Sequence, residues 1–160
     1  MLNVFNRAYD SHKVPPEEAL KKVTVFLGHG RNTLWRDLKE HLRDLHGINV
    51  TAYETGVRAG FTIQEVLEKL SSEASMAFLV HTGEDIDRDG QVRTRENVIQ
   101  ETGLFQGKLG FKRAIVLLEE GCNEFSNIAG LQQIRFAKGN IREVFGDVLA
   151  VLRCEFTSGE

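Results

Sequence analysis

The stretch 93–110, which reads RTRENVIQETGLFQGKLG, contains the side chain best placed for chemistry, Glu101. At about 100° per residue, this stretch forms a helix with an apolar stripe made by Val98, Thr102, Phe105 and Leu109. Glu101 falls at the edge of the stripe with Asn97 and Lys108, more than a turn into the helix, where capping does not explain it. We therefore predict a catalytic carboxylate at the boundary between core and solvent. A solvated helix glutamate is the alternative.

A second candidate site is the turn Gly28-His29-Gly30-Arg31, which follows a short apolar run. Two glycines let backbone amides approach a phosphate, and Arg31 offers a bidentate clamp for it. The turn does not match the three-glycine dinucleotide fingerprint, because Thr33 occupies the third glycine position. An ordinary strand-to-helix turn is the alternative reading.

A third pattern spans residues 85–96 and matches a calcium loop, with Asp85, Asp87, Asp89, Gly90 and Glu96 in the required positions. Its context argues against calcium, because a strand is expected before it where the motif requires a helix. Arginines also add positive charge to the loop. We therefore predict no metal site and a solvated acidic loop that caps the central helix. Calcium binding is the alternative.

The elements around these candidates alternate between strand and helix. Continuous apolar runs predict buried strands at 23–27, 48–53, 76–80, 114–118 and a weaker one at 133–137. The last helix is expected to begin at Asn140, which with Glu143 matches a capping box. This rhythm predicts an α/β fold with a five-stranded parallel sheet of flavodoxin-like order 2-1-3-4-5 and helices on both faces.

The remaining helices have clear start signals. Asn32 or Thr33 is expected to cap the first, whose apolar stripe comprises Leu34, Leu38, Leu42 and Leu45. Thr62 and Glu65 form a capping box for the second, whose stripe comprises Ile63, Val66, Leu67 and Leu70. In this strand order, ligands bind at the carboxyl ends of the first and third strands, which places the segments 28–32 and 81–95 at the site.

Composition limits the class of protein. The chain has 160 residues with a formal charge of -3, so one domain is expected and phosphate neutralisation of nucleic acid is not. Two cysteines without metal spacing indicate reduced thiols. With neither a signal peptide nor a membrane-length apolar run, a cytoplasmic chain without a membrane segment is expected. We assign residues 1–21 to an N-terminal lead-in or linker, 22–155 to a nucleotide-binding domain and 156–160 to a tail.

Four segments together resemble the prokaryotic TIR-like family, whose members are described as nucleotide-binding effectors of cyclic-nucleotide-activated antiphage systems. They are FLGHGRN, FTIQEVLEKL, MAFLVHTGED and TRENVIQETGLFQGKLGFKRAIVLL. The resemblance extends from residue 22 to about residue 152, and its most specific part is the string R-x-N-V-x-x-E-x-G-x-F-x-G-x-L-G. It implies a flavodoxin-like TIR fold and a three-layer architecture.

In active members, this resemblance implies cleavage of NAD+ to nicotinamide and an ADP-ribose product, linear or cyclic. By residue match the catalytic glutamate is Glu101. The substrate-binding set that we predict comprises Gly28, His29, Gly30, Arg31, Thr82, Arg95, Asn97 and Phe105. NAD+ is the substrate, and no further cofactor is expected. Nicotinamide leaves as a neutral base, so one carboxylate suffices to stabilise the positive ribose or to attack it.

The resemblance also implies partners. Arg58, Gly60 and Phe61 lie in the loop through which TIR domains assemble, so a homo-oligomer is expected, along with a cyclic-nucleotide sensor domain or protein. The alternative function is a nucleotide-binding or TIR–TIR interaction module without turnover.

Overall fold

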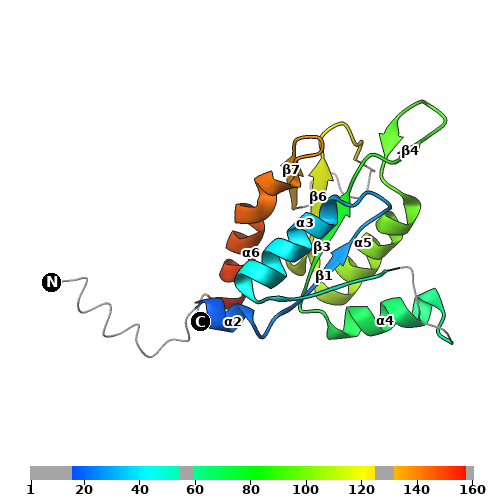
Figure 1. Cartoon of the computed structure of the whole chain (residues 1–160). Helices are drawn as coiled ribbons and strands as arrows, with labels where there is room; N and C mark the ends of the chain where they lie inside the picture. The colour runs from blue at the N-terminus through cyan, green and yellow to red at the C-terminus, as the bar shows by residue number, and fades with distance from the viewer. Residues whose placement is uncertain (1–15, 55–59, 125–131, 158–160) are drawn as a thin grey trace.

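A five-stranded parallel sheet organises the molecule, shown in Figure 1 as a computed structural model that describes residues 16–54, 60–124 and 132–157. Its spatial order is β2-β1-β3-β6-β7, which confirms the predicted order 2-1-3-4-5. The strands are β1 (Thr24–Gly28), β2 (Asn49–Ala52), β3 (Met76–His81), β6 (Ala114–Glu119) and β7 (Gln133–Phe136). Every neighbouring pair in this sheet is parallel.

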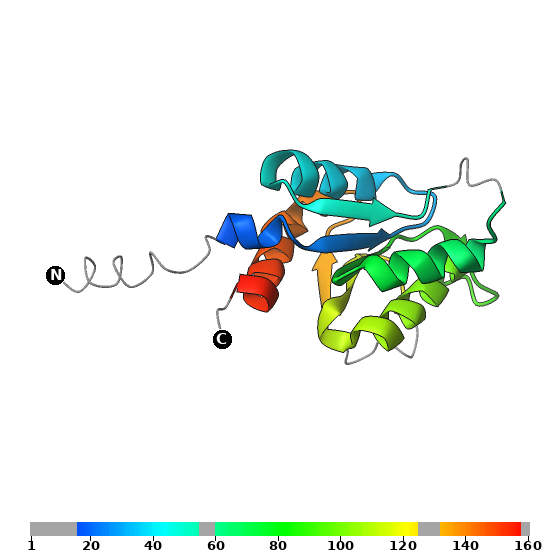
Figure 2. The same cartoon turned by 90° about the horizontal axis from the view of Figure 1, so that it is seen from below.

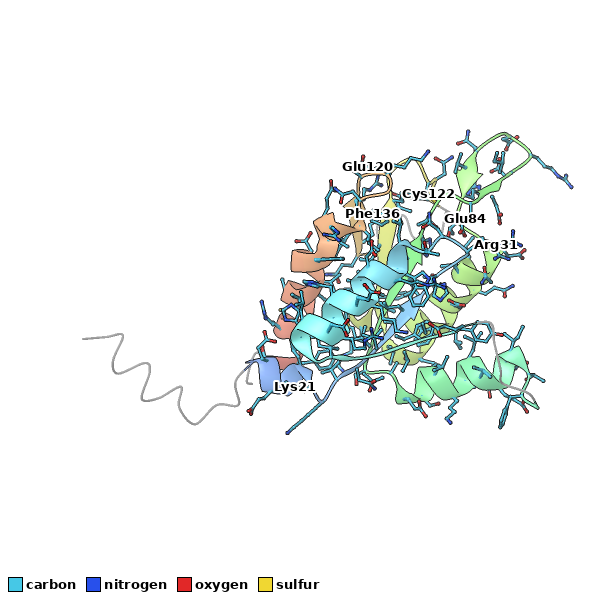
Figure 3. The ribbon with its side chains drawn as sticks, viewed as in Figure 1. Lys21, Arg31, Glu84, Glu120, Cys122 and Phe136 are labelled. Atoms are coloured by element: carbon cyan, nitrogen blue, oxygen red, sulfur yellow. The ribbon has the colours of Figure 1, made fainter. Side chains whose placement is uncertain are left out.

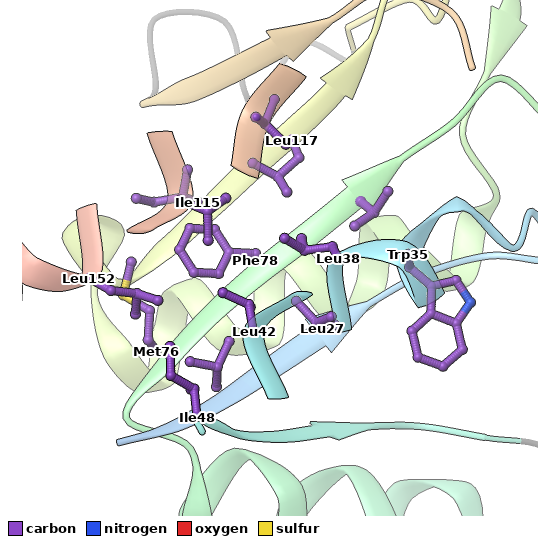
Figure 4. Close-up of a cluster of buried hydrophobic side chains, with 14 of the residues drawn as sticks. Leu27, Trp35, Leu38, Leu42, Ile48, Met76, Phe78, Ile115, Leu117 and Leu152 are labelled. Carbon is purple, nitrogen blue, oxygen red and sulfur yellow. The ribbon is translucent and has the colours of Figure 1, made fainter. Parts of the chain in front are cut away.

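The central strands β3 and β6 form because their apolar runs are buried on both faces. All residues of β3 and β6 are buried, as expected for the centre of a parallel sheet. Because successive side chains point to opposite faces, Phe78 enters one core cluster while Leu79 enters the other. Figure 4 shows the larger cluster, in which Phe78 lies among leucines contributed by helices and neighbouring strands.

Helices cover both faces of the sheet, as Figures 1 and 2 show. One face carries α3 (Leu34–Glu40) and α6 (Phe145–Thr157), and the short α2 (Pro16–Leu20) packs beside α6. The other face carries α4 (Ile63–Glu73) and α5 (Glu96–Leu109). Leu20 of α2 is fully buried in the larger cluster. The chain from residue 16 therefore belongs to the packed body, while residues 1–15 lie outside the described part.

Helix α3 begins at the predicted place, and its last turn departs from regular α-helical geometry. Asn32 Oδ1 accepts the backbone N–H of Leu34 at 3.0 Å, and the helix continues as a π-helical turn, His41–Leu45. The expectation that Leu45 lies in the apolar stripe was wrong, since this side chain is 72% exposed. The wider π turn shifts the residues that follow relative to the 3.6-residue period. Gly47 then takes a φ of 65° and ends the helix.

The capping box of α4 is confirmed in both directions. Thr62 Oγ1 accepts the Glu65 N–H at 3.1 Å, and Glu65 Oε2 accepts the Thr62 N–H at 2.7 Å. The predicted apolar stripe is wrong at Ile63, which is 62% exposed. The buried side chains of this helix begin one turn later, at Val66.

The expected capping box of the last helix is not formed by Asn140 and Glu143. Glu143 instead reaches back to the residue after β7, where its Oε2 accepts the Ala137 N–H at 2.9 Å. The Asn140 side chain donates to the other Glu143 oxygen at 3.2 Å. A 3₁₀ turn, Ile141–Val144, therefore precedes α6, and another, Phe111–Arg113, precedes β6.

Candidate functional site

Glu101 lies on the face of α5 that packs against the sheet, so it is more deeply buried than predicted. Only 4% of the residue is exposed, which corrects its expected place at the boundary between core and solvent. The turn after β1 covers it: a Cβ added at Gly28 would lie 2.9 Å from Glu101 Oε2. That oxygen has no hydrogen-bond partner among the described residues. A buried carboxylate oxygen without a hydrogen-bond partner is costly, and its presence here marks a functional candidate.

Burial raises the pKa of Glu101 to about 7, and a hydrogen bond from the His29 backbone opposes that rise only in part. Near neutral pH the carboxyl group is thus divided between its two protonation states. A cationic ligand in contact with this oxygen would favour the ionised form.

The raised pKa of Glu101 predicts a pH-dependent stability effect. The folded chain holds this proton more tightly than the unfolded chain, where the pKa is near 4.5. The contribution of Glu101 to stability is therefore full below pH 4.5 and is lost as the pH rises to about 7. We therefore expect the free energy of unfolding of Glu101→Gln, relative to that of wild type, to be about 2–3 kcal/mol higher at pH 8 than at pH 4.5. Urea unfolding of both proteins at both pH values measures this change. The same difference in stability between variant and wild type at pH 4.5 and at pH 8 would contradict the prediction.

The close approach of Glu101 to the turn after β1 requires glycine at position 28. An added Cβ would lie 2.5 Å from Leu79 Cδ1 as well as 2.9 Å from Glu101 Oε2, and Leu79 is fully buried. We expect Gly28→Ala to destabilise the fold by about 1–3 kcal/mol. Gly107→Ala on α5 is the control: a Cβ there meets nothing within 4 Å among the described residues, so it should stabilise by up to about 1 kcal/mol. Thermal unfolding of the two variants measures the difference. Equal changes in melting temperature would show that the turn after β1 has space for a Cβ at position 28.

A cleft of about 550 Å³ lies beside this turn, at the carboxyl ends of β1 and β2. Five predicted substrate-binding residues line it, namely His29, Gly30, Arg31, Arg95 and Asn97. Helix α3 and the end of β2 complete the lining with Thr33, Trp35, Arg36, Lys39, Glu40, Arg43, Tyr53 and Glu54. Cationic side chains outnumber carboxylates in this set, so the cleft suits an anionic ligand of nucleotide size.

His29 is held in one orientation within the cleft. Its ring stacks on Trp35 with the centroids 3.8 Å apart and an interplanar angle of 8°, and its Nδ1 donates to the Gly30 carbonyl at 2.8 Å. Burial lowers the pKa of His29, so the ring is neutral at physiological pH. His29 thus fixes the shape of the turn rather than adding positive charge to the cleft.

The remaining described site residues that the sequence predicted, Gly28 among them, do not line this cleft. Phe105 is fully buried and stacks on Phe26 with centroids 4.0 Å apart, so it is a core residue and not a cleft residue. Thr82 is 2% exposed and is not part of the cleft lining. Phe61 is 70% exposed and lines a separate hollow between β2 and α4. Gly60 is also exposed, next to Phe61. Arg58 lies outside the described residues.

The segment that matches a calcium loop forms a β-hairpin, which sequence reasoning missed. Its strands are β4 (Asp85–Ile86) and β5 (Val92–Arg93). Asp87 Oδ1 accepts two backbone N–H groups of the turn, and its Oδ2 pairs with Arg93 Nε at 2.6 Å. Both oxygens are thus engaged in the hairpin. The described residues, which include Asp85, Asp89 and Glu96, contain no group of three or more side chains able to hold a metal.

Glu84, at the base of the hairpin, was also missed. It accepts the backbone N–H of Asn32, and its carboxylate lies where a Cβ at Gly30 would be. Figure 3 labels Glu84 and Arg31 near each other at this end of the molecule. No local sequence signal indicates this contact, because residues 52 positions apart make it.

Behind the site, His81 is buried and its Nε2 donates to Thr102 Oγ1 at 2.9 Å, while that hydroxyl donates to the Val98 carbonyl at 2.7 Å. Burial lowers the pKa of His81 to about 4, so this ring is neutral. Its hydrogen bond joins the end of β3 to the face of α5 that carries Glu101.

Fold and site together define an α/β domain of the flavodoxin-like type, with a cationic cleft and a buried glutamate at the point where the strand order reverses. Residues 24–138 match the family described as "CAP12/Pycsar effector protein, TIR domain". The chain belongs to this family of prokaryotic antiphage TIR effectors, as the sequence resemblance implied.

The likeness of this chain to solved structures is weak. The chain resembles the crystal structure of hypothetical protein TT0462 from Thermus thermophilus, with 14% identity and a TM-score of 0.42. The match covers 91% of this chain but 35% of that one, so the chain spans about a third of that protein's length. No curated protein matches the sequence. Within the described residues, none of the helices combines the length and apolar character needed to cross a bilayer.

Proposed function

We propose that this domain cleaves the nicotinamide–ribose bond of NAD+, with Glu101 as its catalytic residue. The observation that carries the proposal is the placement of Glu101: a buried carboxylate, with one oxygen unpartnered among the described residues, directly behind the turn that lines the cationic cleft. Nicotinamide departs as a neutral base and needs no acid. The barrier lies in the positive charge that develops on the ribose, which an ionised Glu101 would stabilise.

The cleft supplies groups suited to the rest of the dinucleotide. Arg31 and Arg95 come from the turn after β1 and the start of α5, and neither forms an ion pair within the described residues. Guanidinium groups bind phosphate oxygens in pairs of hydrogen bonds. Asn97, one turn before Glu101 on α5, adds a polar side chain at the same end of the cleft.

For Glu101 to reach a ribose in the cleft, the Gly28–His29 turn has to shift, because Glu101 is not part of the cleft lining. We propose that assembly with a second copy drives this shift and that the effector stays silent until it assembles. A cyclic-nucleotide sensor, within the same protein or on a partner, would supply the signal for assembly.

The experiment is nicotinamide release from NAD+, measured by chromatography over a range of protein concentrations, with crowding agents included. We expect wild type to release nicotinamide at a rate that rises faster than linearly with protein concentration, and Glu101→Ala to release none. Retained turnover by the variant would contradict the role of Glu101. Silence of the wild type at every concentration, in protein that sedimentation shows to be assembled, would contradict the activity.

The second candidate is a module that binds a nucleotide or another TIR domain without turnover. The low exposure of Glu101 favours it, since a carboxylate that is 4% exposed meets no ligand in this conformation. In that case the assembled protein binds ADP-ribose and releases no nicotinamide.

A further inference from the structure

Glu54 occupies a distinctive position that the proposed reaction does not use. It follows the end of β2, which runs from Asn49 to Ala52, and it comes 24 residues after Gly30. In doubly wound folds, an acidic residue about 20 residues beyond the glycine turn accepts hydrogen bonds from the adenosine ribose of a dinucleotide. The chain lacks the full glycine fingerprint, so geometry has to decide whether Glu54 serves this purpose.

The strand order places Glu54 and Glu101 on opposite sides of the turn after β1. Glu54 lines the same cleft as His29, Gly30 and Arg31. In the sheet, β1 lies between β2 and β3, so the turn after β1 separates the end of β2, with Glu54, from the elements that follow β3, with Glu101. A dinucleotide whose nicotinamide ribose faces Glu101 and whose pyrophosphate crosses this turn therefore presents its adenosine ribose to Glu54.

The carboxylate is oriented and still available. Lys39 Nζ of α3 lies 3.3 Å from Glu54 Oε1, which holds the side chain against the cleft. The Glu54 side chain is 58% exposed, so its second oxygen can accept hydrogen bonds from a ligand. No side-chain hydrogen bond other than the one from Lys39 involves Glu54 among the described residues.

We propose that Glu54 binds the 2′- and 3′-hydroxyls of the adenosine ribose and so selects dinucleotides with a free 2′-hydroxyl over 2′-phosphorylated ones. This proposal rests on the proposed function for the orientation of the ligand. Hydrogen bonds from the hydroxyls to a charged acceptor are strong. A 2′-phosphate would bring like charge against Glu54 and remove the hydroxyl donor, and both effects weaken binding.

The nearby cations do not reverse this preference. Lys39 is already paired with Glu54, and Arg43 is paired with its neighbour Asp44 at 2.8 Å. Arg36, which also lines the cleft, lies over the Trp35 ring, with its Cζ 5.8 Å from the ring centroid. Arg31 and Arg95, which come from the turn after β1 and the start of α5, lie where the pyrophosphate would cross. Glu54 is therefore the carboxylate that balances the cations at the end of β2.

The test compares the binding of ADP-ribose and of ADP-ribose 2′-phosphate by calorimetry, which needs no turnover. For wild type we expect ADP-ribose to bind about tenfold to a hundredfold more tightly. Glu54→Gln should bring the two affinities to within about threefold of each other. Glu68→Gln removes one negative charge from the exposed face of α4, outside the cleft, and is the matched control. It should change the ratio of affinities by less than about twofold, because screening weakens distant charges.

Four results would each overturn the proposal. Three concern wild type: equal affinities for the two probes, tighter binding of the 2′-phosphate, or no binding of either probe. The fourth is an unchanged ratio of affinities in Glu54→Gln. Turnover of NAD+ and NADP+ is measured in parallel. If ADP-ribose is preferred and the preference depends on Glu54 but neither dinucleotide is cleaved, the proposed activity fails while the role of Glu54 stands. Cleavage of both dinucleotides at equal kcat/KM, without discrimination in binding, supports the activity and rejects the role of Glu54.

Discussion

Glu101→Gln is expected to lower the rate of nicotinamide release by about 10²- to 10⁴-fold. Glutamine keeps the shape of the side chain but lacks the negative charge that stabilises the ribose cation. The loss should fall on kcat, since the charge is needed most in the transition state. The wild-type rate should also fall as the pH drops below about 7, where the raised pKa of Glu101 leaves the carboxyl group protonated. Initial rates across a pH series measure both effects.

Glu96→Gln provides the matched control for this prediction. Glu96 is an exposed carboxylate in the first turn of the same helix, so the substitution makes the same chemical change five residues away. It should leave kcat within about twofold of wild type, because an exposed charge is well screened. Equal losses in the two variants would show that the net charge of α5, rather than the carboxylate at position 101, matters.

Phe105→Ala is expected to destabilise the domain by about 3–5 kcal/mol. Phe105 is fully buried, and its ring stacks on Phe26 of β1 with an interplanar angle of 13°. This contact joins α5 to the centre of the sheet, so truncation leaves a cavity beneath the helix that carries Glu101. At about 2–4 °C per kcal/mol for a chain of this size, the melting temperature should fall by at least about 6 °C.

Phe105→Leu separates the core role of Phe105 from the substrate-binding role that the sequence suggested. Leucine refills most of the space, so about half of the lost stability should return, and the KM for NAD+ should stay unchanged. An altered KM at unaltered stability would restore Phe105 to the binding site.

The fold was largely predictable because a buried parallel sheet has a strong local signature. Uninterrupted apolar runs identified β1, β3 and β6, and weaker patterns identified β2 and β7. The rhythm of strands and helices gave the order β2-β1-β3-β6-β7. The errors fall where a long-range or non-standard feature overrides the local period. Leu45 is exposed by a π turn, and Glu143 is drawn to the Ala137 amide instead of a helix cap.

The candidate site was predictable only where several of its residues lie within one short segment of the chain. The turn 28–31 and the start of α5 were identified because their residue types are unusual for their local positions, and five of the predicted residues do line one cleft. Periodicity placed Glu101 on the correct helix. It did not give the depth of burial, which depends on the turn after β1 lying over the carboxylate.

Contacts between distant segments could not be foreseen. Glu84 binds the turn through the Asn32 amide, and His81 binds Thr102 across the interior. Neither pair has a sequence pattern, because each depends on the packing of separate elements. The short hairpin β4–β5 was hidden by its match to a calcium loop.

Strand β2 is an edge strand of the sheet and, among the described strands, pairs only with β1. The two halves of the cleft therefore differ in local stability. Amide protons on an outer strand exchange through small opening motions, whereas those of a central strand such as β3 exchange only when much of the fold opens. The half of the cleft near Glu54 therefore borders the more labile part of the sheet. A bound nucleotide, by linkage, should slow hydrogen exchange in β2 far more than in β3.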